Sequence, residues 1–280
     1  MKREGPGLVP DAAVHKPAWN PELRLLVIPA LIYAAWILDI YLLEGRVNLF
    51  SRIDPAGVLL YTLVACVLIG TIVPILWIRM SFIAGAVNMF HIGFRSLKRT
   101  LAACSGTILI GYILLVIASP FGSDRTAFFN SFLLLLPTAI AAVMVCLTLI
   151  GTHVQAYVRA SGAIVSVHVG VAVTALAFCF IAVVIAPGAQ LQNVFFWFVC
   201  IGIVSALFFF AVRDIYATTI VVAGLTVFGM ANRIDPSLLH GSTPVVSLSA
   251  FIAIAVLVAV HWYFSRNFTT ILVPELSESP

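Results

Sequence analysis

The sequence predicts an all-α integral membrane protein, and both its composition and its pattern of apolar runs support that prediction. Of its 280 residues, 62% are hydrophobic and 9% are charged, whereas an ordinary soluble domain has about 25% charged residues. A water-soluble globule of this length could not bury so much apolar side chain. Helices satisfy their own backbone hydrogen bonds and can therefore cross lipid. The net charge of +4 is too small and too scattered to indicate a nucleic-acid partner.

Eight apolar runs are long enough to cross a hydrocarbon layer of roughly 30 Å, which takes about 20 helical residues. They cover residues 24–43, 56–78, 100–118, 129–152, 164–186, 194–212, 215–231 and 245–265. Most are separated by Pro or Gly, which end helices. Only Arg213-Asp214 interrupts the apolar sequence between the sixth and seventh runs. Because a charged pair is costly inside the membrane, we predict a tight turn there.

Eight crossings would leave both tails on the same side of the membrane. That side has eleven of the 15 Lys and Arg residues, and the other has Arg46, Arg52, Arg125 and Arg233. By the positive-inside rule, we expect cytoplasmic tails over residues 1–22 and 267–280. Because no targeting motif names a particular membrane, we expect the single membrane domain, residues 23–266, to lie in the cell membrane. The moderately apolar segment 81–100 is expected to form an interfacial helix at the cytoplasmic face.

Two histidines are candidates for a polar site near that face. His153 ends the fourth run and His168 begins the fifth, so their rings could approach each other. Clustered histidines can hold a metal ion, but no carboxylate lies in the spans beside them. We therefore predict structural or hydration roles for both, with no bound metal and no other cofactor. The five cysteines lie in five different runs without a CxxC spacing, which is typical of small buried apolar side chains.

Three short patterns lie at regular helical spacing between about residues 150 and 230. Val154-Gln155 precedes Arg159, Phe178 precedes Ala182 by four residues, and Val222 precedes Thr226 by four residues. These patterns resemble the EExxxR, FxxxH and HxxxN or HxxxD motifs of the CAAX prenyl protease and bacteriocin-processing family of intramembrane proteases. The resemblance implies a protease-like core over this region, within a fold of about eight helices. Arg159 and Phe178 match framework positions of those motifs.

The chemical residues of the family are replaced in this chain. Val154 and Gln155 stand where the two glutamates would be, Ala182 and Val222 replace the histidines, and Thr226 replaces the Asn or Asp. Without a glutamate to activate water, general-base help worth about 10²–10⁴-fold is missing. The resemblance therefore implies a catalytically silent relative, a pseudoenzyme acting as a membrane binding or scaffold protein. Its expected partners are the lipid bilayer and another membrane protein.

Two alternatives remain open from the sequence. One is a membrane enzyme, a divergent intramembrane protease, whose nonstandard site is built from His153, Gln155, Arg159 and His168. The other is a small-solute transporter, although transporters usually show charge inside the membrane or paired broken helices. Two interpretations of Arg159 compete. As a surface residue it would extend to the lipid headgroups. We favour an inward orientation, with its guanidinium bonded to the carbonyl oxygen of Gln155 one turn back.

Overall fold

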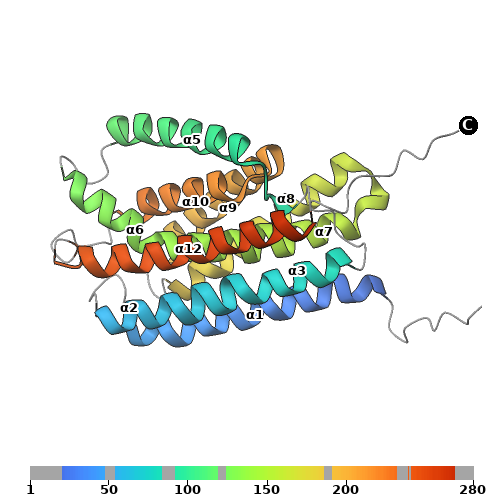
Figure 1. Ribbon diagram of the computed structural model, residues 1–280, viewed down its shortest axis with the longest axis horizontal. Coiled ribbons are helices and arrows are strands. Elements are labelled where there is room, and N and C mark those ends of the chain that lie inside the picture. The colour runs from blue at the N-terminus through green and yellow to red at the C-terminus, as the bar shows by residue number, and fades with distance from the viewer. Residues whose placement is uncertain are drawn as a thin grey trace, which may run out of the picture.

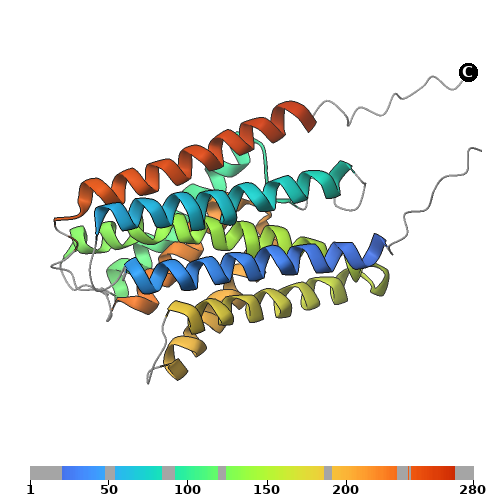
Figure 2. The ribbon, with the colours of Figure 1, turned by 90° about the horizontal axis from the view of Figure 1, so that it is seen from below.

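The computed structural model describes residues 21–47, 54–83, 92–118, 124–185, 191–231, 239 and 241–268, and every regular element within these ranges is a helix (Figures 1 and 2). Seven of these helices are long and apolar enough to cross a membrane. The predicted all-α membrane fold is thus confirmed for the described residues.

The first four predicted runs correspond to four helical rods. Helix α1 covers Pro21–Val47, and α5 covers Leu97–Ala118. The second rod is α2 (Pro55–Tyr61), η1 (Thr62–Ile72) and α3 (Val73–Ile83) in direct succession. The fourth is α6 (Arg125–Ala142), η2 (Val143–Gly151) and α7 (Thr152–Tyr157). Of the predicted interfacial segment 81–100, residues 81–83 belong to α3 and residues 97–100 begin α5, while residues 84–91 lie outside the described residues.

The last four predicted runs also correspond to helices. A short turn, η3 (Arg159–Ser161), leads into α8 (Ala163–Ile185), which is followed by α9 (Leu191–Val212), α10 (Ile215–Met230) and α12 (Thr243–Phe268). The turn predicted at Arg213-Asp214 is confirmed. Helix α10 has 16 residues, a length of roughly 24 Å, and is therefore shorter than the seven helices that can span the membrane. An eighth full crossing stays a prediction.

The rod from Arg125 to Tyr157 lies at the centre of the bundle in both views (Figures 1 and 2). It is the most buried of the candidate spans, and every residue of η2 is buried. Helices α1, α8, α10 and α12 all pack against it. Helix α5 lies at the periphery, packs mainly on α10, and buries only Thr100 and Thr107. Its remaining apolar side chains are available to lipid.

Helices α8 and α9 cross closely because of a glycine. A Cβ added to Gly202 of α9 would lie 2.8 Å from the Cα of Ala175 and 2.9 Å from the Cβ of Phe178, both on α8. No side chain fits at this distance from backbone atoms, so Gly202 permits the contact.

Two stretches, η1 and η2, are π-helical, with hydrogen bonds from residue i+5 to residue i. Each receives a hydrogen bond from another helix. The Trp36 indole N–H donates to the carbonyl of Ala65 in η1 at 3.0 Å, and the Thr174 hydroxyl donates to the carbonyl of Cys146 in η2 at 3.4 Å. Stretches of π-helix are rare and are often found at functional sites.

Helix α1 begins and α12 ends at the same end of the bundle (Figures 1 and 2). We call this the tail end. The α9–α10 turn and the start of α5 also lie at the tail end (Figure 1), where backbone and side-chain hydrogen bonds join them to each other.

Candidate functional site

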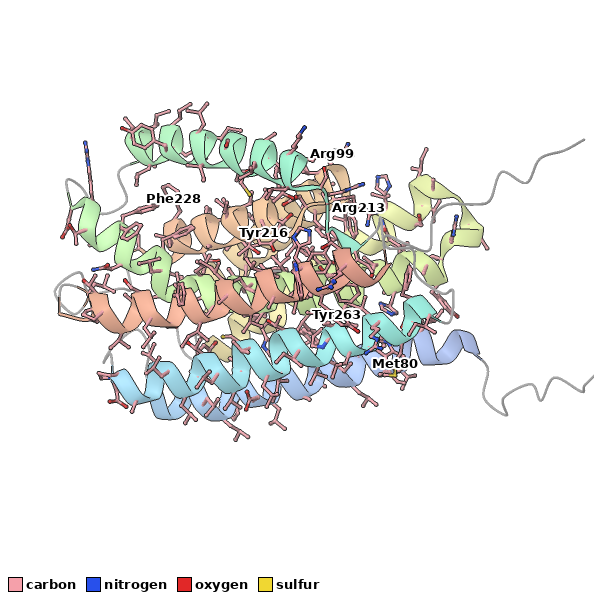
Figure 3. All side chains as sticks on the ribbon, viewed as in Figure 1. Met80, Arg99, Arg213, Tyr216, Phe228 and Tyr263 are labelled. Carbon is pink, nitrogen blue, oxygen red and sulfur yellow. The ribbon has the colours of Figure 1, made fainter. Side chains whose placement is uncertain are left out.

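A cluster of polar side chains lies at the tail end, where the segment before α5, the end of α7 and the α9–α10 turn meet. We call Arg95, Thr100, Gln155, Arg213 and Asp214 the polar cluster. Figure 3 labels Arg213 together with its neighbours Arg99 and Tyr216. The cluster joins parts of the chain more than 100 residues apart, since Thr100 bonds to Asp214 and Arg95 to Arg213.

Asp214 is the N-cap of α10 and the centre of the cluster. Its backbone is extended, and its Oδ1 accepts a hydrogen bond from the N–H of Ala217 at 2.9 Å. This bond satisfies a backbone donor that the first turn of a helix leaves unpaired. Its Oδ2 accepts from the hydroxyl of Thr100 at 2.6 Å, and the residue is 1% exposed. One buried carboxylate therefore begins α10 and fastens α5 to it.

Arg213 ends α9 with a left-handed backbone, at φ +54°. Its guanidinium lies over the ring of Phe210, 4.8 Å from the centroid, and its Nη2 donates to Oε1 of Gln155 at 2.7 Å. Burial, together with the positive charge of Arg95, lowers the pKa of Arg213 to about 10. The side chain therefore remains charged at neutral pH and joins α9 to α7.

The segment before α5 is held against the α9–α10 turn by two bonds. Nε of Arg95 donates to the carbonyl of Arg213 at 3.1 Å, and the N–H of Ile215 donates to the carbonyl of Gly93 at 3.2 Å. Gly93 has φ +97°, and a Cβ there would lie 3.0 Å from the ring of Phe209. Burial and then the charge of Arg99 lower the pKa of Arg95, while Asp214 opposes the shift.

A second set of contacts connects the cluster to α12. The Nδ1 of His261 lies 3.1 Å from the hydroxyl of Tyr216, in the first turn of α10. The ring of Phe94 packs on both His261 and Phe264, at centroid distances of 5.1 and 5.5 Å. The tail end is thus held together by the segment before α5, α10 and α12.

Of the predicted site residues, Gln155 belongs to the polar cluster but Arg159 does not. Gln155 is buried, and its carbonyl oxygen accepts from Arg213 instead of Arg159. Arg159 is exposed, so the predicted inward orientation is wrong. The physical reason is that α7 ends at Tyr157 and Val158 leaves the α-helical conformation, with ψ 7°. Arg159 therefore lies on the η3 turn, outside the helical register that would place it beside Gln155.

The two predicted histidines lie in different environments. His153 is fully buried, with Nδ1 2.7 Å from the carbonyl of Leu149 and Nε2 2.9 Å from the hydroxyl of Ser81. A carbonyl can only accept, so Nδ1 donates and Nε2 accepts from Ser81. His168 is exposed, and its Nδ1 bonds to the carbonyl of Ile164 on its own helix. The structure therefore does not join the two rings in one site.

The remaining predicted residues lie on α7, α8 and α10. Phe178 and Val222 are buried in the core, and Val154 is half-buried and packs against it. The hydroxyl of Thr226 donates to the carbonyl of Val222 at 2.7 Å, within its own helix. Ala182 lies on α8, but its side chain is outside the described residues. In the described part of the chain, no three His, Cys, Asp or Glu side chains are grouped so as to hold a metal ion.

Ser81, Arg95 and Thr100 are partners of these residues that no local sequence pattern marks, because each bonds to a residue more than 70 positions away. A signal for Asp214 was available, since an Asp immediately before an apolar helical run is a typical N-cap.

The fold and the hydropathy of its helices define the class: this is a multi-pass helical membrane protein. Comparison with protein-family models, curated proteins and solved structures gave no match for the chain. The resemblance to the CAAX prenyl protease family stays a prediction.

Proposed function

We propose that this protein is a catalytically silent relative of intramembrane proteases that acts as a membrane binding or scaffold protein, holding another membrane protein in the lipid bilayer. One observation carries the proposal. Three buried polar side chains of the predicted core region bond to other segments of the bundle: Gln155 bonds to Arg213, His153 to Ser81, and Asp214 to Thr100. Polar side chains that bond to neighbouring segments in this way stabilise a rigid bundle.

The chemistry at the predicted catalytic positions also supports a silent site. A hydrolase of the resembled family needs a carboxylate that takes a proton from water. The amide of Gln155 cannot take a proton, and its oxygen accepts from a charged guanidinium. Val222 presents an alkyl side chain to the core, and the hydroxyl of Thr226 bonds to its own helix. The alternative enzyme site gains no support, because Arg159 and His168 are exposed and His153 is buried.

A search for new protein termini tests the silent-protease part of the proposal. Membranes from cells with the chain, without it, and with Gln155→Ala are compared for peptide ends created by proteolysis. We expect the three sets of peptide ends to be the same. We also expect a membrane protein to copurify, uncleaved and in fixed stoichiometry, with the tagged chain. Cleavage products that depend on the chain and decline with Gln155→Ala would contradict the proposal.

We further propose that the tail end faces the cytoplasm and that the protein resides in the cell membrane. The eleven-to-four distribution of Lys and Arg supports this orientation, as does the start of α1 and the end of α12 at one end of the bundle. Single cysteines at Ser96 and Ser265 should react with a membrane-impermeant thiol reagent only after the cells are opened. A cysteine at Asp124 should react in intact cells. The reverse pattern would contradict the orientation.

A further inference from the structure

Cations gather at the start of α5 and the α9–α10 turn. Arg95, Lys98, Arg99 and Arg213, which we call the basic patch, lie on these two adjacent segments. Lys98 and Arg99 are exposed, whereas Arg95 and Arg213 are half-buried. Among the described residues of the two segments, Asp214 is the one carboxylate. Four positive charges therefore face a single negative one.

The carboxylate of the patch already has hydrogen-bond partners. Asp214 directs Oδ1 to the N–H of Ala217 and Oδ2 to the hydroxyl of Thr100, and it is buried. Its two oxygens are therefore used at the start of α10 and in the bond to α5, and neither of these two bonds is made to Lys98 or Arg99.

The cations of the patch repel one another. Arg99 lowers the pKa of Arg95, and Arg95 lowers that of Arg213, in addition to the effect of burial. Lys98 and Arg99 also lie in the first turn of α5, where the helix dipole disfavours positive charge. An anion bound across these side chains would relieve both effects.

The surroundings indicate which anion fits. The patch includes the first turn of α5, a helix long and apolar enough to cross a membrane, and cations at the ends of such helices are typically near phospholipid headgroups. One turn further along α5, Leu101 is exposed, and Ile108 and Leu109 continue an apolar surface along the same helix. A molecule bound there would have its charge at Lys98 and Arg99 and its apolar part along α5.

We propose that the basic patch binds the phosphate group of an anionic phospholipid, whose acyl chains lie along the exposed surface of α5. Arg95 and Arg213 contribute positive charge from beneath, while Lys98 and Arg99 contact the headgroup. The hydrogen bond between Arg95 and the carbonyl of Arg213 keeps the two segments together. This site is independent of the proposed scaffold function, because it requires no protein partner.

The test is a titration of the purified full-length chain in a neutral detergent, followed by native mass spectrometry. The probes are phosphatidylglycerol, phosphatidylcholine of the same chain length, and inorganic phosphate. We expect wild type to bind phosphatidylglycerol more tightly than phosphatidylcholine. A cation beside an anionic lipid surface is worth about 1 kcal/mol, so each of Lys98→Gln and Arg99→Gln should weaken binding roughly fivefold, and the double variant roughly 30-fold.

Arg159→Gln is the matched control, because Arg159 is exposed on the α7–α8 turn but lies outside the patch. It should bind phosphatidylglycerol as wild type does. Equal weakening by Arg159→Gln would show that general surface charge is responsible and would overturn the site. Equal binding of both lipids, or binding of inorganic phosphate as tight as that of phosphatidylglycerol, would overturn the lipid assignment.

Discussion

Replacing Asp214 by alanine should destabilise the bundle more than the loss of a helix cap alone. The substitution removes the N-cap bond to Ala217 and leaves the hydroxyl of Thr100 without the acceptor it now has 2.6 Å away. Loss of an N-cap costs about 1 kcal/mol, and a buried hydroxyl without its partner costs roughly 2 kcal/mol more. We therefore expect Asp214→Ala to lower the free energy of unfolding by about 3 kcal/mol.

The chain offers a control for this experiment. Asp54 is the N-cap of α2, where its Oδ2 accepts from the N–H of Gly57 at 2.9 Å, but it is exposed. Asp54→Ala removes a cap without leaving a buried hydroxyl, so it should cost about 1 kcal/mol or less. Unfolding in detergent with increasing denaturant, followed by tryptophan fluorescence, measures both variants.

A double variant isolates the contribution of Thr100. In Asp214→Ala combined with Thr100→Val, no hydroxyl remains to be satisfied, so the double variant should be about 1–2 kcal/mol more stable than Asp214→Ala alone. If Asp214→Ala costs no more than Asp54→Ala, the bond between α5 and α10 does not contribute to stability. That result would refute the view of the polar cluster as a structural connection.

Three other predictions concern packing and the predicted site residues. Gly202→Ala should destabilise by roughly 1–3 kcal/mol, because its Cβ would be 2.8 Å from a backbone atom of α8. The control is Gly106→Ala, whose Cβ would have no heavy atom within 4 Å and which should be neutral or stabilising. Thermal melts in detergent measure both variants. Ser81→Ala should cost about 1–3 kcal/mol by removing the donor to buried His153, and an unchanged melting temperature would count against that bond. Arg159→Ala should stay within about 0.5 kcal/mol of wild type, since the side chain is exposed; a larger loss in denaturant unfolding would contradict its surface position.

Most of the helices could be predicted from the sequence because lipid permits few alternatives to helical structure. An apolar run long enough to cross the membrane must pair its own backbone N–H and C=O groups. The predicted runs coincide with helices because a helix does this. The turn at Arg213-Asp214 could also be predicted, since charges are expensive in hydrocarbon. The unexpected feature was its conformation, in which Arg213 has a positive φ and bonds to α7.

The partners within the polar cluster could not be predicted, because they depend on how distant helices pack. Gln155 and Arg213 are 58 residues apart, and no spacing rule connects them. The position of Arg159 depends on where α7 ends. Gly162, with φ +101°, is a typical helix-terminating residue, but it predicts an end just before residue 162 and would leave Arg159 in the last turn, whereas α7 ends at Tyr157. The π-helical stretches have no signal in apolar sequences of this kind.

The π-helical stretches determine the rotational setting of the long helices. An α-helix turns by about 100° per residue. If one π-helical turn changed to α-helical hydrogen bonding, one residue would leave that turn, and the rest of the helix would rotate by roughly 100° about its axis. His153 and Gln155 follow η2 directly, and such a rotation would turn both away from Ser81 and Arg213. The hydrogen bond from Thr174 to η2, like that from Trp36 to η1, therefore keeps the two rods in the angular position at which the tail end is assembled. A change in the Thr174 bond, far from the polar cluster, would be transmitted to Gln155 as torsion along one rod, and a change in the Trp36 bond would be transmitted to Ser81 along the other.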